Sequence, residues 1–65
     1  MKLKSIIMLA NMKDDESVKK IQLALAATRV DFTIDLEKQI VVVDGDIHMV
    51  NIAKRIILDQ GFVII

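Results

Sequence analysis

Acidic and hydroxyl side chains gather in one short stretch of the chain, and they are the first candidates for chemistry. The candidate metal ligands are consecutive: Asp14, Asp15, Glu16 and Ser17. Their oxygens suit a hard divalent cation, but calcium takes about six to eight oxygen ligands, and three adjacent carboxylates on one helical turn rarely enclose an ion. The simpler interpretation is a helix start, with Asp14 as the N-cap and the next two carboxylates at the positive end of the helix dipole.

The other ionisable groups form no catalytic arrangement. The chain has no Cys and its single His is His48, which excludes a disulfide and a zinc site built from Cys and His. Asp44-Gly45-Asp46 has the spacing of a calcium-loop fragment but lacks the later ligands, so it predicts a turn and a helix cap. We expect a solvated His48 and no enzymatic activity.

Composition predicts one small domain, residues 1–65, without a nucleic-acid or membrane partner. Nine basic residues balance nine acidic ones, and Phe32 and Phe62 are the only aromatic residues, whereas nucleic acids select basic surfaces with stacking side chains. The apolar run Ile6–Ala10 is shorter than the roughly 7–15 residues of a secretion signal and the about 20 of a membrane span. A cytoplasmic location is expected.

The spacing of apolar side chains predicts six elements. Strands are expected at Leu3–Ala10, Val30–Leu36, Ile40–Val43 and Phe62–Ile65. A first helix follows Asp14, because one face repeats at steps of three and four residues through Val18, Ile21, Ala24, Leu25 and Thr28. A second follows Asp46, its expected N-cap, with apolar positions at Ile47, Val50, Ala53, Ile56 and Ile57. Gly61 then has the place of a helix C′ residue of positive φ.

The order βαββαβ defines an α+β fold. It divides into two similar halves, Lys2 to Leu36 and Gln39 to Ile65, each made of a strand, a helix and a strand. Right-handed crossovers then give a four-stranded antiparallel sheet with two helices on one face.

This topology separates the acidic residues into two groups. The loop Asn11–Asp14 shares one end of the sheet with the turns Glu37–Gln39 and Gln60–Phe62, whereas Asp44, Asp46 and His48 lie at the opposite end. The two groups therefore cannot join in one metal site.

The open face of the sheet is expected to be apolar. If Ile7, Leu9, Val41 and Val43 point to the helices, the side chains that point away are Ile6, Met8, Ile40, Val42, Val63 and Ile65. A half-solvated antiparallel sheet is normally polar on that side. A register slip of one residue does not remove the patch, because both faces of the first and third strands are apolar. These six residues are the predicted interface.

The chain resembles the heavy-metal-associated domain family, the ferredoxin-like module of copper chaperones and metal-pump N-terminal regions. The resemblance covers nearly the whole chain and rests on the order of elements and on Met12, Val18-Lys19-Lys20-Ile21, Leu25, Asp35-Leu36-Glu37 and Gly61-Phe62. The family signature Gly-Met-x-Cys-x-x-Cys falls on Asn11–Ser17. It implies that Met12 plugs the core beneath the loop, but its two thiol positions are Asp14 and Ser17. Copper(I) prefers thiolate or thioether ligands and is not expected to bind.

Three hypotheses of function follow. The leading one is a non-enzymatic, heavy-metal-associated-like module that has lost thiol metal binding and works through protein contact, as a homodimer. The second is a metal carrier that binds a divalent cation with Asp14, Asp15 and Glu16. The third is a small-molecule regulatory module, a class that shares the βαββαβ order but usually turns into its first helix through Pro or Gly.

Overall fold

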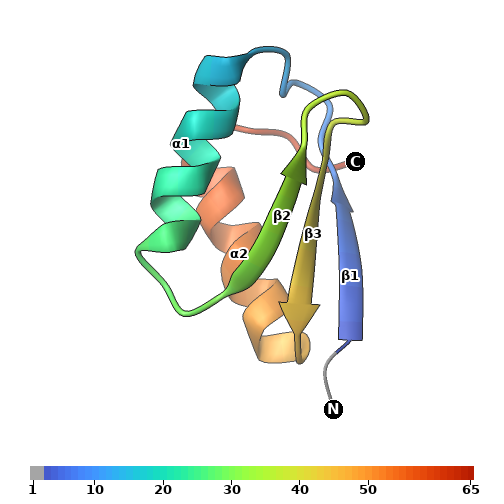
Figure 1. Ribbon diagram of the computed structural model, residues 1–65, viewed down its shortest axis with the longest axis vertical. Coiled ribbons are helices and arrows are strands. Elements are labelled where there is room, and N and C mark those ends of the chain that lie inside the picture. The colour runs from blue at the N-terminus through green and yellow to red at the C-terminus, as the bar shows by residue number, and fades with distance from the viewer. Residues whose placement is uncertain (1–2) are drawn as a thin grey trace.

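The computed structural model describes residues 3–65, which form a sheet with two helices packed on one side (Figure 1). The elements follow in the order β1 (Leu3–Met8), α1 (Asp15–Ala26), β2 (Asp31–Asp35), β3 (Ile40–Gly45) and α2 (Ile47–Asp59). The sheet has three antiparallel strands in the order β1-β3-β2. The α+β class is therefore as predicted. Lys2, where the first predicted half begins, lies outside the described residues.

The central strand, β3, has a paired strand on each side. Val41 pairs with Ile7 of β1 and with Ile34 of β2. The turn between β2 and β3 is closed by the Lys38 N–H, which donates to Asp35 Oδ1 at 3.1 Å, and Gln39 takes a positive φ of 54°. A tight antiparallel reversal of this kind fixes the register of the two strands.

β3 is longer than predicted. It continues through Asp44 to Gly45, whereas the strand predicted from the sequence ended at Val43. Gly45 is tolerated there because the backbone passes close to α2: a Cβ on this residue would lie 3.0 Å from the Cβ of Met49. The glycine thus serves close packing of a strand against a helix, not the interruption of the strand.

The predicted fourth strand does not form as such among the described residues. The segment 62–65 makes one isolated bridge, Leu9 to Ile64, with two backbone hydrogen bonds: Ala10 N–H to Val63 C=O and Ile65 N–H to Met8 C=O, both 2.9 Å. The ladder stays short because the Val63 N–H donates to the side chain of Asn11 at 2.9 Å and not to a β1 carbonyl.

Both helices begin with the expected N-caps, and α2 ends at the expected glycine. Asp14 and Asp46 are the N-caps of α1 and α2. At the end of α2, Gly61 has φ 93°, the Gly61 N–H donates to Leu58 C=O, and the Phe62 N–H donates to Ile57 C=O. This is the hydrogen-bond pattern of a Schellman motif, which needs a residue of positive φ.

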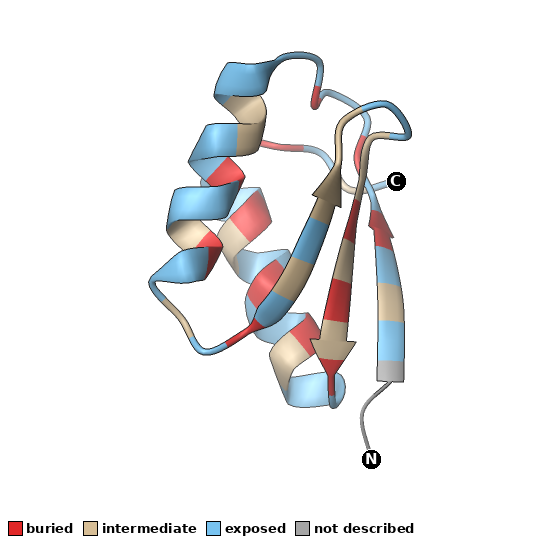
Figure 2. Ribbon diagram, in the orientation of Figure 1, coloured by how far each residue is buried: buried red, intermediate tan, exposed pale blue. Residues whose placement is uncertain are grey.

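The core lies between the sheet and the helices. Its largest fully buried side chains are Ile7, Met12, Ile21, Leu25, Val41, Val43 and Ile57. Figure 2 shows buried residues alternating with exposed or intermediate ones along β1 and β3, and along one stripe of each helix. One expectation was wrong: Ile47 was placed in the buried stripe of α2 but is 67% exposed. It is the first residue of the helix, and the side chains that reach the core are Val50, Ala53 and Ile57.

Candidate functional site

The acidic stretch forms the start of α1, with Asp14 as the N-cap. Asp14 has extended backbone angles, and its Oδ1 accepts two hydrogen bonds from Ser17, one from the backbone N–H and one from the hydroxyl, each 2.9 Å. The pKa of Asp14 is lowered from its ordinary value of 3.8, first by the backbone N–H of Ser17, then by its hydroxyl and by the charge of Lys20. One carboxylate oxygen of Asp14, the first of the candidate metal ligands, therefore already accepts hydrogen bonds at the helix start.

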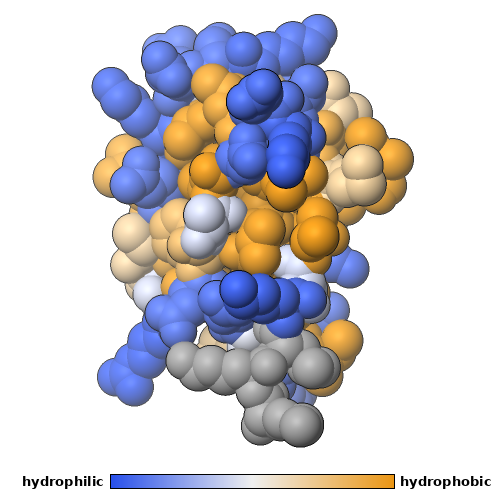
Figure 3. All heavy atoms as spheres, turned by 45° about the vertical axis from the view of Figure 1, so that its right-hand side comes forward, coloured by the Kyte–Doolittle hydropathy of each residue, from blue (hydrophilic) through white to orange (hydrophobic). Residues whose placement is uncertain are grey.

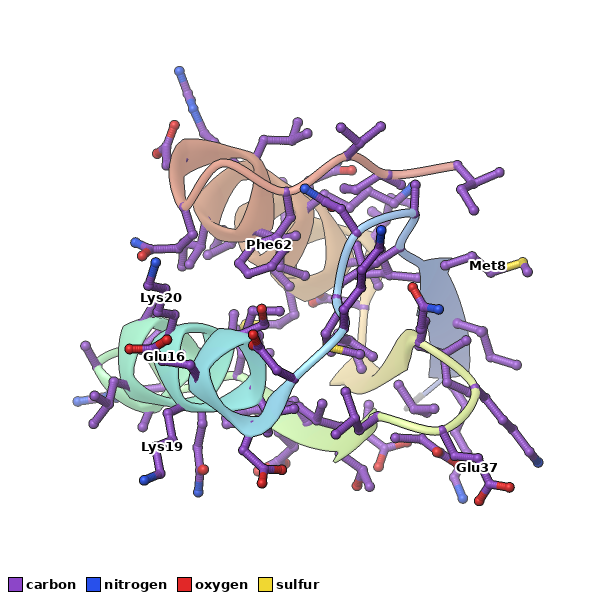
Figure 4. All side chains as sticks on the ribbon, turned by 90° about the horizontal axis from the view of Figure 1, so that it is seen from above. Met8, Glu16, Lys19, Lys20, Glu37 and Phe62 are labelled. Atoms are coloured by element: carbon purple, nitrogen blue, oxygen red, sulfur yellow. The ribbon has the colours of Figure 1, made fainter. Side chains whose placement is uncertain are left out.

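The neighbouring carboxylates lie on the exposed first turn of α1. Asp15 and Glu16 are both exposed, and Figure 4 shows Glu16 on the side of α1 away from the sheet, with Lys20 pointing toward α2 and Lys19 pointing the opposite way. Over residues 3–65, no three His, Asp or Glu side chains are grouped so that they could hold a metal ion. The same part of the chain has no enclosed pocket.

The second acidic group lies at the other end of the sheet. Asp46 Oδ1 accepts from the Met49 N–H at 3.1 Å, and His48 is exposed in the first turn of α2. The loop after β1 is instead joined to the β2–β3 turn by the Leu9 N–H, which donates to Gln39 C=O at 2.9 Å. Figure 1 shows these two turns together at the end opposite to the start of α2. The predicted separation of the two groups is confirmed.

Asn11 has a structural function that the sequence alone did not reveal. Its side-chain amide accepts from the Val63 N–H at 2.9 Å and donates to Gly61 C=O at 3.3 Å. One side chain therefore supplies a donor and an acceptor to the C-terminal segment, as a strand backbone would. Asn is one of the few side chains that both donate and accept hydrogen bonds. This property of Asn11 was the signal in the sequence from which such a contact could have been predicted.

Met12 lies beneath the same loop and is 0% exposed. This is the position that the family resemblance implies for a core plug. Its burial ties the loop between β1 and α1 to the core, although the loop itself is exposed on either side of Met12.

The open face of the sheet is the most unusual surface of the molecule. Ile6 is 64% exposed, Met8 52%, Val63 56% and Ile65 76%, while Ile40 and Val42 are half-buried. Figure 4 shows Met8 pointing away from the helices, with Phe62 on the helix side. We call the six predicted interface residues, Ile6, Met8, Ile40, Val42, Val63 and Ile65, the open-face patch.

The open-face patch has a charged border. At the end of the sheet where β1 begins, Lys4 is paired in register with Asp44, and Asp44 with Asp31. On the β2 side, the outward residues are Thr33 and Asp35. Figure 3 shows the result as an apolar area above a band of hydrophilic residues. An apolar centre within a polar rim is the usual composition of a protein interface.

Comparison of the chain with protein-family models, with curated proteins and with solved structures finds no match. In the part of the chain that the structure describes, no helix is long and apolar enough to cross a membrane.

Proposed function

We propose that this chain is a non-enzymatic contact module that associates with a second copy of itself through the open-face patch. The observation that carries the proposal is the exposure of Ile6, Met8, Val63 and Ile65, each more than half accessible on one face of the sheet. Antiparallel sheets with one solvated face are normally polar there, and a contiguous exposed apolar surface usually marks an interaction site.

The proposal includes descent from a heavy-metal-associated domain of ferredoxin-like fold. The segment 62–65 lies beside β1, so the spatial order of the four chain segments would be that segment, β1, β3 and β2, which supports a ferredoxin-like arrangement. The burial of Met12 supports the same kinship.

In this proposal the former metal loop has become a helix cap and has no cofactor. Asp14 and Ser17, at the two thiol positions of the family signature, bind each other at 2.9 Å. Their hydrogen bonds satisfy free N–H groups at the helix start. A cytoplasmic location, expected from the sequence, belongs to the proposal.

Sedimentation equilibrium over a range of protein concentrations tests the proposed self-association. We expect the wild-type chain to dimerise and Ile6→Lys to remain monomeric, because the substitution places a charge within the apolar contact. The matched control is Leu23→Lys on α1, since Leu23 is also largely exposed (74%) but lies away from the sheet. A wild-type chain that stays monomeric at millimolar concentration would show that the proposal is wrong.

A further inference from the structure

The outward side chains of the open face lie in rows across the strands. Lys4 is opposite Asp44, Ile6 is opposite Val42, and Met8 is opposite Ile40. Each row thus has one member on β1 and one on β3, and the only charged row of the three combines a positive with a negative side chain. A second copy of this surface is therefore complementary to the first when β1 of each copy faces β3 of the other.

A second argument comes from the area that a dimer needs. Stable interfaces bury about 800 Å² on each partner, and the accessible surface of the chain is 4628 Å² in total. About a sixth of the molecular surface must therefore be covered. The open-face patch spans only a few side chains of one face, so its border, including Lys4 and Asp44, has to enter the contact.

We propose that two copies pack open face to open face about a two-fold axis that runs along the strands between β1 and β3, so that Lys4 of each copy contacts Asp44 of the other. This inference rests on the proposed function. Packed sheets lie about 10 Å apart, with their strands within about 30° of each other. The rotation lays Ile6 over Val42 of the other copy and Met8 over Ile40.

The charges favour this axis over the alternative across the strands. An axis across the strands between the levels of Ile6 and Met8 would lay Lys4 over Ala10, which offers no countercharge, so that only Asp44 would come level with an opposite charge, that of Lys38 in the β2–β3 turn. A charge covered without a partner loses its hydration and gains nothing in return. With the axis along the strands, the two-fold symmetry forms the Lys4–Asp44 contact twice, as an isologous interface requires.

The other border of the interface remains hydrated in this arrangement. The same rotation brings Ile65 near Asp35 of the other copy, and the Asp35 carboxylate already accepts a hydrogen bond from the Lys38 N–H. That contact lies at the outer edge of both sheets, where water reaches the carboxylate.

The test is a charge exchange between two variants of the full chain, Lys4→Asp and Asp44→Lys. Each variant alone would place like charges at both contacts, so we expect self-association at least about tenfold weaker than in the wild type. In a mixture of the two, every contact again joins opposite charges. We expect a heterodimer at least about tenfold tighter than either homodimer, measured by sedimentation or by fluorescence transfer between labelled chains.

Two kinds of control separate association from folding. Lys19→Asp on α1 makes the same charge change as Lys4→Asp but lies on an exposed helix position, and we expect wild-type association. Lys4→Gln and Asp44→Asn remove the attraction without placing like charges opposite each other within one sheet. We expect each to weaken the dimer by a few-fold and to keep a cooperative thermal transition.

The outcomes distinguish the inference from the proposed function. If neither charge variant nor neutral variant changes the dimer affinity while Ile6→Lys abolishes association, the open face forms the dimer but the axis inferred here is wrong. If the wild-type chain is monomeric, both are wrong. Heterodimer formation confined to the mixture of the two exchanged variants supports the axis.

Discussion

Asp14 shows how one carboxylate can be a helix cap at a position where a family resemblance predicts a ligand. Both hydrogen bonds on its Oδ1 come from Ser17, three residues later, the spacing of an N-cap. The lowered pKa has the same cause, because the donors favour the charged form of the carboxyl group.

This cap makes the stability of the protein depend on pH. A carboxyl group whose pKa is lower in the folded than in the unfolded chain contributes stability above its ordinary pKa of 3.8, and the contribution is lost as the pH falls through the folded value. We expect Asp14→Ala to lower the thermal midpoint by about 5 °C at pH 7 and by much less near pH 2.5. Asp14→Asn should lose less at pH 7, since Asn is also a good N-cap. Calorimetry at the two pH values checks this, and an equal loss at both would contradict it.

Met12 should be the most sensitive position of the loop before α1. Its side chain is fully buried, so Met12→Ala leaves a cavity and is expected to cost about 2–5 kcal/mol of unfolding free energy. A chain of 65 residues has roughly 3–10 kcal/mol in total, so much of its stability would be lost.

Urea denaturation measures the effect of Met12→Ala. Met12→Leu conserves volume and should cost less than about 1.5 kcal/mol. The neighbouring Lys13→Ala is an exposed control and should leave the transition unchanged. A small loss in Met12→Ala would show that the loop does not depend on its burial.

At the scale of elements, the C-terminal segment 62–65 is only weakly attached to the sheet. It has one bridge to β1, and the two hydrogen bonds of the Asn11 side chain supplement it. Short pairings of this kind open locally without unfolding the rest of a domain.

Asn11→Ala should therefore release this segment selectively. We expect faster amide hydrogen exchange at Val63 and Ile65, by about tenfold, with little change in β3, because the substitution removes the two hydrogen bonds at 2.9 and 3.3 Å but leaves the sheet intact. Asn51→Ala, on the exposed side of α2, is the matched control. Equal protection of Val63 in all three chains would exclude the function assigned to Asn11.

Sequence periodicity predicted the elements best where the local pattern and the tertiary contacts agree. The alternation in β1 and the Asp caps of both helices are found as expected, because each depends on neighbours within a few residues. The continuation of β3 through Gly45 depends on its pairing with β1, and the shortness of the C-terminal pairing depends on Asn11, more than 50 residues away in sequence. Such distant contacts leave no periodic signal.

At the scale of the whole molecule, dimerisation through the open-face patch would couple stability to protein concentration. A partner that binds only the folded state raises the apparent stability by mass action. We expect the thermal midpoint to rise by a few degrees between about 10 μM and 1 mM in the wild type, and to stay constant in Ile6→Lys. Calorimetry or circular dichroism at several concentrations measures this, and a constant wild-type midpoint would contradict it.

The sequence predicted the residues of the candidate interface more fully than it predicted those of a metal site. Strand alternation alone identified which side chains point away from the helices, since a strand places successive residues on opposite faces. The charged row of Lys4 and Asp44 was not predicted, because it depends on the register of β1 against β3 and on the extension of β3 beyond Val43.

The position of β1 also governs the order in which the chain can fold during synthesis. β1 is synthesised before its partner β3, which follows about 35 residues later. The bridge between Leu9 and Ile64 can form only after Ile64 has been synthesised. Contacts between distant parts of a chain form slowly, since a long loop must close first. A nascent chain can form α1 early, but it carries an unpaired apolar strand until β3 has emerged, and in that interval the strand is exposed to misassociation.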